Sequence, residues 1–198
     1  MKYIAIESEY GSGGNEIARE VARKCNIPCF GKEVIESASE TYGISTDEFE
    51  KYKETISGSY LYTVSILERA RCENHNTLIK EGNLYLALQK TIKDFAKEGS
   101  AVFIGNCASA VLKNNGNVLR VFIRSTAEEK TKRIISSYNV PEEFANKKML
   151  NEDRKSSAYY FANTTRNWAC PDNYDIILDS GKLGISGCVD ILEFMMTN

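Results

Sequence analysis

A glycine-rich turn near the start of the chain holds the residues best suited to binding a charged ligand. It lies between an apolar run at 2–7 and a helical pattern that begins at Ile17. The turn consists of Ser8, Glu9, Tyr10, Gly11, Ser12, Gly13, Gly14 and Asn15. Glycines let backbone N–H groups approach an anion closely, and a following helix points its unsatisfied N–H groups into the same space. The turn therefore predicts a phosphate cradle suited to a nucleotide.

The turn keeps the shape of the usual P-loop and lacks its charge. That loop, G-x-x-x-x-G-K-[ST], carries a lysine for the β- and γ-phosphates and a hydroxyl for Mg²⁺. When Gly11 and Gly13 are set on its interior glycines, the first glycine falls on Ser8 and the lysine on Gly14. Glycine-rich turns between a strand and a helix also occur as plain tight connections. The segment by itself favours anion binding and a simple connection equally.

Composition limits the classes of protein to consider. With 198 residues, 42% of them hydrophobic and 26% charged, the chain fits one globular domain. A formal net charge of −2 gives no global basic field, so we expect no nucleic-acid partner. No apolar run is long enough to cross a bilayer and no signal-peptide pattern precedes the first strand, so we expect a cytoplasmic protein without membrane contact. The single histidine, His75, excludes a histidine triad or a multi-histidine zinc site.

Apolar runs of strand length recur along the chain at wide intervals. They occupy residues 2–7, 27–30, 101–104, 118–123 and 174–178. Near-continuous apolar runs separated by helical stretches are typical of a parallel sheet that helices cover on both faces. The sequence therefore predicts an α/β architecture with about five strands.

The segment 31–99 carries helical patterns and no strand signal. A capping box at Ser45 to Glu48 predicts the start of one helix, and the apolar residues at 61–67 suggest another. Leu84, Leu88 and Ile92 fall on one face of a further helix that Gly99 ends. A helical excursion of roughly seventy residues exceeds what a crossover needs. It forms either the wall of a second substrate site or a cover for the sheet.

Two helices are predicted after the fourth apolar run. Ser125 is placed to cap the first, and Pro141 lies in the first turn of the second. The segment 146–166 that follows is polar and rich in charge. Such a run is usually a solvated helix face, and the alternative is a mobile lid that closes over phosphates.

Several short motifs, taken together and in order, resemble one family. They are I-A-I-E-S-E-Y-G-S-G-G-N-E-I-A, I-P-C-F-G-K-E-V-I, A-V-F-I-G-N-C-A, V-F-I-R-S-T-A-E-E-K-T-K-R-I, D-R-K-S-S-A-Y-Y and W-A-C-P-D-N-Y-D-I-I-L-D-S. This series is similar to the cytidylate kinase-like family of P-loop proteins from about residue 2 to residue 195. The resemblance implies the P-loop NTPase fold, a three-layer α/β/α structure with a five-stranded parallel sheet. It also implies a core at 1–30, 100–140 and 170–198, a helical insertion at 31–99 and a lid at 141–169.

The resemblance also implies an activity and the residues that carry it. The expected reaction is phosphorylation of a nucleoside monophosphate such as CMP, with ATP and Mg²⁺. The phosphates of ATP are expected on Ser8, Gly11, Ser12, Gly13, Gly14 and Asn15, with Ser12 also assisting Mg²⁺. Lys32, Asn106 and Asp153 are expected to contact the acceptor, and Lys130, Arg133 and Arg154 to neutralise charge during transfer.

The chain departs from the pattern of the family that it resembles mainly by losing charge. The positions concerned are Gly14, Asn15, Gly31, Asn106 and Ser156, together with Lys130, which stands where relatives have arginine. One catalytic arginine can be worth ~10³-fold or more in rate. Two hypotheses follow: an ATP-dependent phosphotransferase, or a nucleotide- or phosphate-binding regulatory protein with impaired chemistry. The apolar residues of 45–98 add a weaker expectation of a homodimer.

Overall fold

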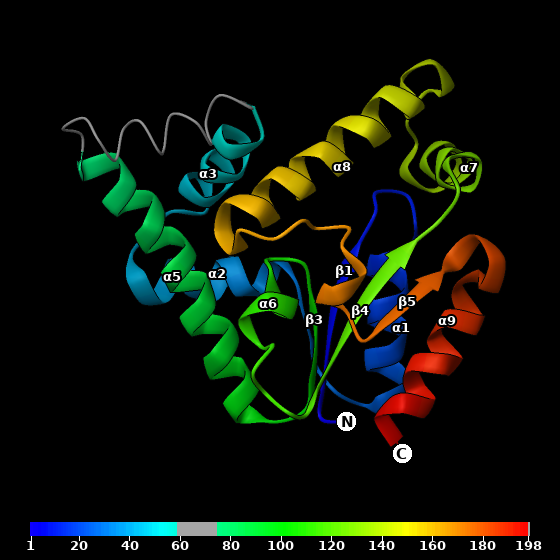
Figure 1. Ribbon diagram of the computed structural model, residues 1–198, viewed down its shortest axis with the longest axis horizontal. Helices are drawn as coiled ribbons and strands as arrows, with labels where there is room; N and C mark the ends of the chain where they lie inside the picture. The colour runs from blue at the N-terminus through cyan, green and yellow to red at the C-terminus, as the bar shows by residue number, and fades with distance from the viewer. Residues whose placement is uncertain (59–74, 198) are drawn as a thin grey trace.

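The computed structural model describes residues 1–58 and 75–197, and its centre is a five-stranded parallel sheet. The strand order is β2-β3-β1-β4-β5, which places the first strand in the middle (Figure 1). The bounds are β1 (Tyr3–Ser8), β2 (Cys29–Phe30), β3 (Ala101–Ile104), β4 (Val118–Arg124) and β5 (Ile176–Asp179). The predicted α/β fold with five strands is confirmed. Because the strands are parallel, the turns that follow β1, β3, β4 and β5 meet at one edge of the sheet.

The predicted strand bounds hold for β3 and differ slightly elsewhere. β2 is only two residues long, since the proline at position 28 has no N–H to donate and contributes only its carbonyl, to Val102. β5 begins at Ile176, later than predicted. A 3₁₀ turn, η1 (Pro171–Asn173), precedes it, and the Tyr174 N–H closes that turn on the Pro171 carbonyl at 3.0 Å.

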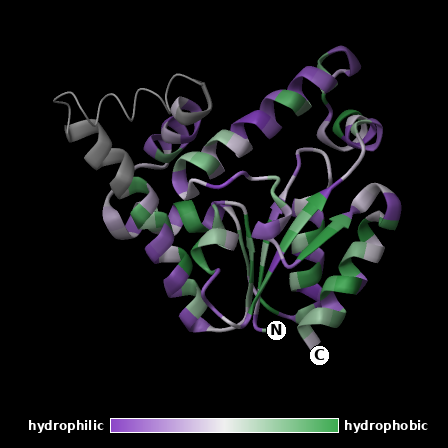
Figure 2. Ribbon diagram, viewed as in Figure 1, coloured by the Kyte–Doolittle hydropathy of each residue, from purple (hydrophilic) through white to green (hydrophobic). Residues whose placement is uncertain are grey.

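Helices cover both faces of the sheet. On one face α1 (Gly14–Cys25) and α9 (Ser180–Thr197) pack against Ile4 and Ile6 of β1. On the other face α5 (His75–Glu98) and α6 (Ala108–Val111) pack against Tyr3 and Ala5. Side chains alternate between the faces along β1, as in any strand. Figure 2 shows the resulting hydrophobic strands between helices of mixed character.

The described part of the segment 31–99 is helical, as predicted. It contains α2 (Lys32–Tyr42), α3 (Thr46–Gly58) and α5. The capping box that starts α3 is present: the Glu48 N–H lies 3.3 Å from the Ser45 hydroxyl, and the Ser45 N–H donates to the Glu48 carboxylate at 3.2 Å. The helix suggested at 61–67 lies outside the described residues. α5 buries its predicted apolar face in the core.

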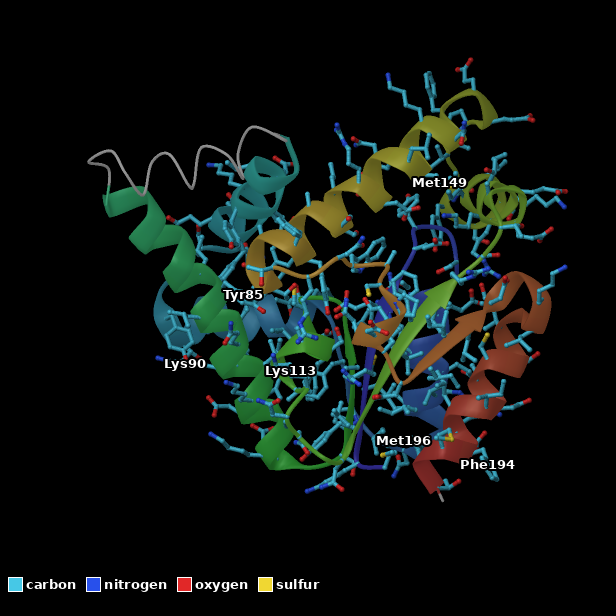
Figure 3. All side chains as sticks on the ribbon, viewed as in Figure 1. Tyr85, Lys90, Lys113, Met149, Phe194 and Met196 are labelled. Carbon is cyan, nitrogen blue, oxygen red and sulfur yellow. The ribbon has the colours of Figure 1, made fainter. Side chains whose placement is uncertain are left out.

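The segment 126–164 forms two helices that lie near the loop edge of the sheet (Figure 1). α7 (Ala127–Tyr138) is capped by Thr126, whose hydroxyl accepts from the Glu129 N–H, so the predicted cap at Ser125 is wrong by one residue. α8 (Glu142–Thr164) is one long helix across the predicted lid, packed between α7 and α3. Met149 of α8 lies in a small apolar cluster with Ile134 of α7 (Figure 3).

Across the described helices, none combines the length and the apolar character that a membrane crossing requires.

Candidate functional site

The glycine-rich turn follows β1 and leads directly into α1. Gly11 and Gly13 have φ angles of 85° and 80°, a left-handed conformation that favours glycine. Space is restricted as well, because a Cβ on Gly13 would lie 2.5 Å from Cδ1 of Ile185. The two glycines therefore fix a tight, buried loop that reaches the surface at Asn15 and Glu16.

Gly14 explains why this loop has no P-loop lysine. A Cβ at this position would lie 2.2 Å from the hydroxyl oxygen of Ser8. Contacts that short do not occur in folded proteins, so any side chain at position 14 requires Ser8 to shift. Ser8 and Gly14 therefore form a matched pair, in which the serine occupies the space beside the first turn of the helix.

The first turn of α1 presents unused hydrogen-bond donors. Among the described residues, no acceptor is found for the backbone N–H groups of Gly14, Asn15 and Glu16, whereas the Ile17 N–H donates to the Gly13 carbonyl at 2.9 Å. These donors lie at the positive end of the helix dipole. The loop can therefore bind phosphate oxygens through its backbone without a lysine.

Ser12 is committed to holding the loop together. It is fully buried, and its hydroxyl lies 2.7 Å from the Glu9 carbonyl and 3.2 Å from the Ile123 carbonyl. Its own carbonyl accepts from the Ser180 hydroxyl at 2.6 Å, which links the loop to the start of α9. The predicted role of Ser12 in Mg²⁺ binding stays a prediction that requires this hydroxyl to turn away from its carbonyls. Within residues 1–58 and 75–197, no group of three or more His, Cys, Asp or Glu side chains is arranged to hold a metal ion.

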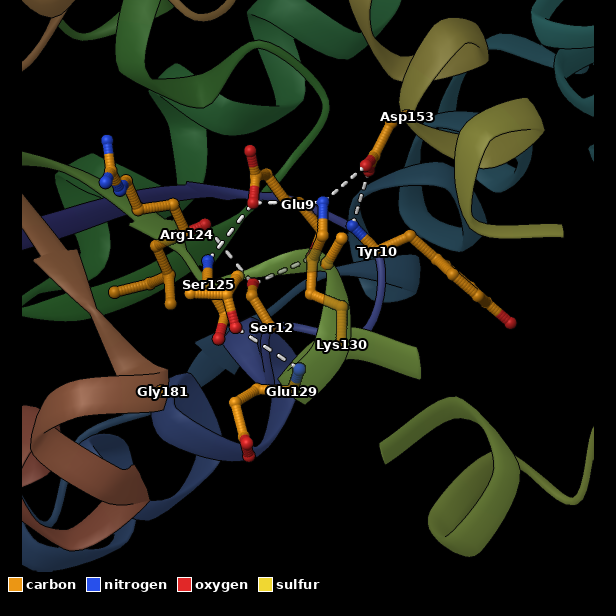
Figure 4. A network of polar contacts seen from close by, with 12 residues as sticks. Glu9, Tyr10, Ser12, Arg124, Ser125, Glu129, Lys130, Asp153 and Gly181 are labelled. Atoms are coloured by element: carbon orange, nitrogen blue, oxygen red, sulfur yellow. Dashed lines mark hydrogen bonds and ion pairs between the residues drawn. The ribbon is translucent and has the colours of Figure 1, made fainter. Parts of the chain in front are cut away.

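An ion cluster, the loop clamp, joins the loop to α7 and α8 (Figure 4). It consists of Glu9, Lys130 and Asp153, and Nζ of Lys130 lies 3.1 Å from a Glu9 carboxylate oxygen and 2.9 Å from one of Asp153. The other Asp153 oxygen accepts from the Tyr10 N–H at 2.6 Å. Burial opposes the charge on Lys130, but the hydrogen bonds that it donates to Asp153 and Glu9, with the attraction of these two carboxylates, outweigh burial and raise the pKa of this lysine. The clamp thus neutralises one predicted catalytic cation.

The two predicted arginines occupy different places. The guanidinium of Arg133 lies against Gly13 in the loop and pairs with Glu16 at 2.7 Å. Arg154 lies on another face of α8, where it donates to Asn151 at 3.1 Å and borders an exposed hollow that Phe144 also lines. The structure therefore brings Arg133 to the loop and leaves Arg154 away from it, so a catalytic role for Arg154 would require α8 to move.

A pocket of about 430 Å³ opens beside the loop and extends toward the helical insertion. We call it the acceptor pocket, and its lining includes Glu7, Lys32, Lys53, Asn106, Glu152 and Tyr159. Asn15 lines it as well, so the pocket reaches the first turn of α1. Residues of the insertion therefore line a pocket, and other residues of it cover the sheet. A role of the insertion in binding a second substrate stays a prediction.

Two of the three predicted acceptor contacts line this pocket. The Asn106 side chain donates to the Gly31 carbonyl at 3.0 Å, and the exposed Lys32 side chain lies 3.4 Å from Glu36. Asp153 is absent from the pocket lining because its carboxylate is held in the loop clamp. Its contribution is to position the loop, and an acceptor contact would require the clamp to open.

Glu7 is the most deeply buried acidic residue among the pocket residues that were not predicted from the sequence. It is 6% exposed, and burial raises its pKa to about 8, with the polar side chains of Trp168 and Ser109 opposing that shift only in part. The sequence did carry a signal. Glu7 is an acidic residue within an otherwise apolar strand, one position before the glycine-rich turn.

A smaller pocket of about 350 Å³ lies on the other side of the loop. Its lining includes Gly11, Arg133, Ser180 and Gly181. The loop therefore separates two pockets, an arrangement that allows a phosphate-bearing donor and an acceptor to meet at its backbone.

The sequence profile described as the cytidylate kinase-like family matches residues 3–182. The chain belongs to this family. It is 24% identical over 200 residues to a cytidylate kinase of Pyrobaculum calidifontis, covering 100% of this chain and 95% of that one. It is also 24% identical over 199 residues to a cytidylate kinase of Methanocaldococcus jannaschii, covering 98% and 97% of the two chains.

Solved structures agree on the fold. A protein from Eubacterium ventriosum described as uncharacterized aligns with a TM-score of 0.72 at 22% identity, over 100% of this chain and 99% of that one. A deoxyadenosine kinase from M. mycoides with bound dATP aligns with a TM-score of 0.51 at 13% identity, over 99% and 100%. The fold is thus that of P-loop kinases, and family and fold together support a nucleotide kinase-like role.

Proposed function

We propose that this protein is an ATP-dependent phosphotransferase that moves a phosphoryl group to a small acceptor in the acceptor pocket. The observation that carries the proposal is the set of unused N–H groups at Gly14, Asn15 and Glu16, which border this pocket at Asn15. Phosphoryl transfer depends mainly on positioning and on stabilising negative charge. A backbone cradle between two pockets supplies the positioning.

The residues present fit the phosphates better than they fit a metal ion. The N–H groups of the loop would hold the phosphate oxygens, and Arg133 lies close enough to Gly13 to neutralise part of their charge. Mg²⁺, which kinases of this class generally use, supplies further charge neutralisation and binds mainly through substrate phosphates and water. Because the Ser12 hydroxyl is occupied, we derive no step through the ion.

Family membership makes CMP the first acceptor to test. Lys32 and Asn106 line the acceptor pocket and are the predicted acceptor contacts that it contains. The assay is conversion of ATP to ADP with CMP and Mg²⁺, coupled to detection of CDP. We expect turnover with CMP or a related acceptor, and ATP binding to folded protein without any turnover over a panel of acceptors would contradict the proposal.

Arg133 provides a variant that tests where the reaction takes place. Arg133→Ala is expected to lower the turnover rate by ~10³-fold, as for other cations that stabilise the transferred group. The matched control is Arg23→Ala, because Arg23 is also an arginine paired with a glutamate but lies on the exposed face of α1. Equal rates for the two variants would place the chemistry elsewhere.

A second function, nucleotide binding without chemistry, is favoured by one observation. Glu9 and Asp153 already neutralise Lys130, which withdraws a cation from the loop edge. On this alternative, ATP binds and raises the melting temperature but is not consumed. The assay with CMP separates the two functions. The homodimer and the cytoplasmic location expected from the sequence stay predictions.

A further inference from the structure

The phosphate loop carries a carboxylate of its own beside the place where a phosphate would bind. Glu16 lies in the first turn of α1, and its backbone N–H is one of the three for which the described structure shows no acceptor. Its side chain accepts from Nη1 of Arg133 at 2.7 Å. Cζ of Arg133 lies 3.3 Å from the position that a Cβ on Gly13 would occupy. This ion pair of Glu16 and Arg133, which we call the loop latch, therefore lies at the phosphate cradle.

The loop latch joins the walls of two hollows. Glu16 lines a hollow of about 670 Å³ between α1 and α9, together with Ile185 of α9. Arg133 lines the smaller pocket of about 350 Å³ that also contains Gly11. Ile185 lies beside the loop as well, because a Cβ on Gly13 would lie 2.5 Å from its Cδ1. A ligand that enters either hollow therefore meets one partner of the loop latch.

The loop latch differs from the loop clamp in its exposure to solvent. In the clamp the side chain of Lys130 is 8% exposed. In the latch the side chains of Arg133 and Glu16 are 26% and 59% exposed. Exposed ion pairs contribute little to stability, whereas breaking a buried pair is strongly destabilising. A ligand can therefore open the loop latch while the loop clamp keeps the loop in shape.

A phosphate group competes with the Glu16 carboxylate on favourable terms. The carboxylate accepts one hydrogen bond from the guanidinium of Arg133. A phosphate can accept two parallel bonds from a guanidinium, and on this loop it can also accept from the N–H groups of Gly14 and Asn15. We propose that Glu16 occupies Arg133 in the empty loop as a substitute for a phosphate, and that ATP binds by displacing this carboxylate.

The loop latch gives Glu16 a defined role. It is not a catalytic residue, because its carboxylate leaves Arg133 before the phosphates are in place. It lowers the affinity of the loop for the donor, because binding must first break the ion pair. This inference rests on the proposed phosphotransferase function and deepens it by naming a residue that sets the affinity for ATP.

The size of the effect follows from the charges. The interaction of two unit charges 4 Å apart in water corresponds to a factor of about five in a binding constant. Measured exposed ion pairs reach about this strength at most. The effect should weaken as salt is added, because salt screens interactions between exposed charges.

The test measures the binding of ATP with Mg²⁺ by isothermal titration calorimetry, without an acceptor, at low and at high ionic strength. The proteins are wild type, Glu16→Gln, Arg133→Ala and the double variant. Glu20→Gln is the matched control, because Glu20 is also a glutamate of α1 that pairs with an arginine, Arg23 at 2.6 Å, one turn further along. Thermal denaturation of each protein without ATP shows that it is folded.

We expect Glu16→Gln to bind ATP about fivefold more tightly than wild type at low ionic strength, with a smaller gain at high ionic strength. Glu20→Gln should bind ATP within about twofold of wild type, since its charge lies away from the cradle. In the Arg133→Ala background, Glu16→Gln should gain less than about twofold, because no guanidinium remains to be released.

Unchanged or weaker ATP binding by folded Glu16→Gln would overturn the inference. An equal gain with and without Arg133 would also overturn it, because it would show a general repulsion by the carboxylate. Both results leave the phosphotransferase proposal intact. The predicted gain in binding, with no turnover on any acceptor, would support the loop latch and contradict the phosphotransferase proposal. A failure of all the folded proteins to bind ATP would overturn both.

Discussion

The two sides of the glycine-rich loop differ in what their buried acidic groups do. On the side of α7 and α8, the charges of the loop clamp are paired within the protein, and Asp153 also accepts from the loop backbone. On the side of the acceptor pocket, Glu7 and Tyr159 are buried, and the Tyr159 hydroxyl is unpartnered. Pairing in the loop clamp holds the loop in shape, whereas Glu7 has no cation within ion-pair distance among the described residues and lines a pocket. The comparison teaches that a charged residue near a phosphate loop need not act on the phosphate.

Breaking the loop clamp should give the largest effect on stability. Lys130→Met leaves Glu9 and Asp153 without their shared cation in a mostly buried place. Removing one partner of a buried ion pair costs about 3–5 kcal/mol. Urea denaturation of Lys130→Met and of Lys132→Met measures the difference, since the exposed Lys132 also pairs with two glutamates and should cost about 0–1 kcal/mol. Similar midpoints for the two variants would show that the clamp does not hold the loop.

Filling the loop should give a smaller effect than breaking the loop clamp. Gly14→Ala places a methyl group 2.2 Å from the Ser8 hydroxyl. Overpacking of this kind costs about 1–3 kcal/mol and should also weaken ATP binding, because the first turn of α1 must shift. Gly116→Ala is the control, with no atom within 4 Å of the added group. Ser8→Gly in the Gly14→Ala background should restore both properties, and a failure to restore them would remove the steric explanation.

The buried carboxyl group of Glu7 should make stability depend on pH. Its folded-state pKa is raised from 4.5 to about 8, so between these values the folded protein retains a proton that the unfolded chain has lost. The free energy of unfolding should therefore fall by about 1.4 kcal/mol per pH unit as the pH rises from about 4.5 to 8, and this contribution should then level off. Urea denaturation over pH 5–9 should show the slope in wild type and its loss in Glu7→Gln. If the free energy of unfolding of wild type and of Glu7→Gln varied with pH in the same way, the assignment of this pH dependence to Glu7 would be refuted.

The smallest expected effect compares two buried tyrosines. Tyr159→Phe removes a buried hydroxyl without a partner, so it should not lower the free energy of unfolding and should raise it by up to about 1 kcal/mol as the desolvation cost is relieved. Tyr174→Phe removes a hydroxyl that donates to the Trp168 carbonyl at 2.6 Å and should cost about 1 kcal/mol. Thermal denaturation of both variants measures the difference. An equal loss would mean that the Tyr159 hydroxyl is bonded in solution.

The fold was largely predictable because its strands, helix starts and tight turn are each determined by residues close together in the sequence. Five apolar runs gave the parallel sheet, and the Ser45 and Glu48 pair gave the start of α3. The tight turn was visible as well, since Gly11 and Gly13 adopt the left-handed conformations that only glycine adopts readily. Helix bounds differ from the predicted ones by a residue where two adjacent residues are both suited to cap the helix. In α7 the cap is Thr126 and not the predicted Ser125.

The roles of the site residues were less predictable because they depend on long-range contacts. Lys130 and Asp153 are 23 positions apart, and their partner Glu9 lies more than a hundred positions earlier. Nothing local to Asp153 indicates that it meets the loop backbone. Arg154 follows it directly, yet the helix turns it to another face. Glu7 became recognisable only when the pocket beside it was known.

The measurement that tests the central claim most directly is a backbone amide titration by NMR with ATP and Mg²⁺. The loop should bind phosphate through the N–H groups of Gly14, Asn15 and Glu16, so their resonances should shift most, while that of Gly116 should stay in place. Saturable shifts centred on these residues are the predicted result. Shifts confined to other parts of the molecule, or none at millimolar ATP, would contradict the account.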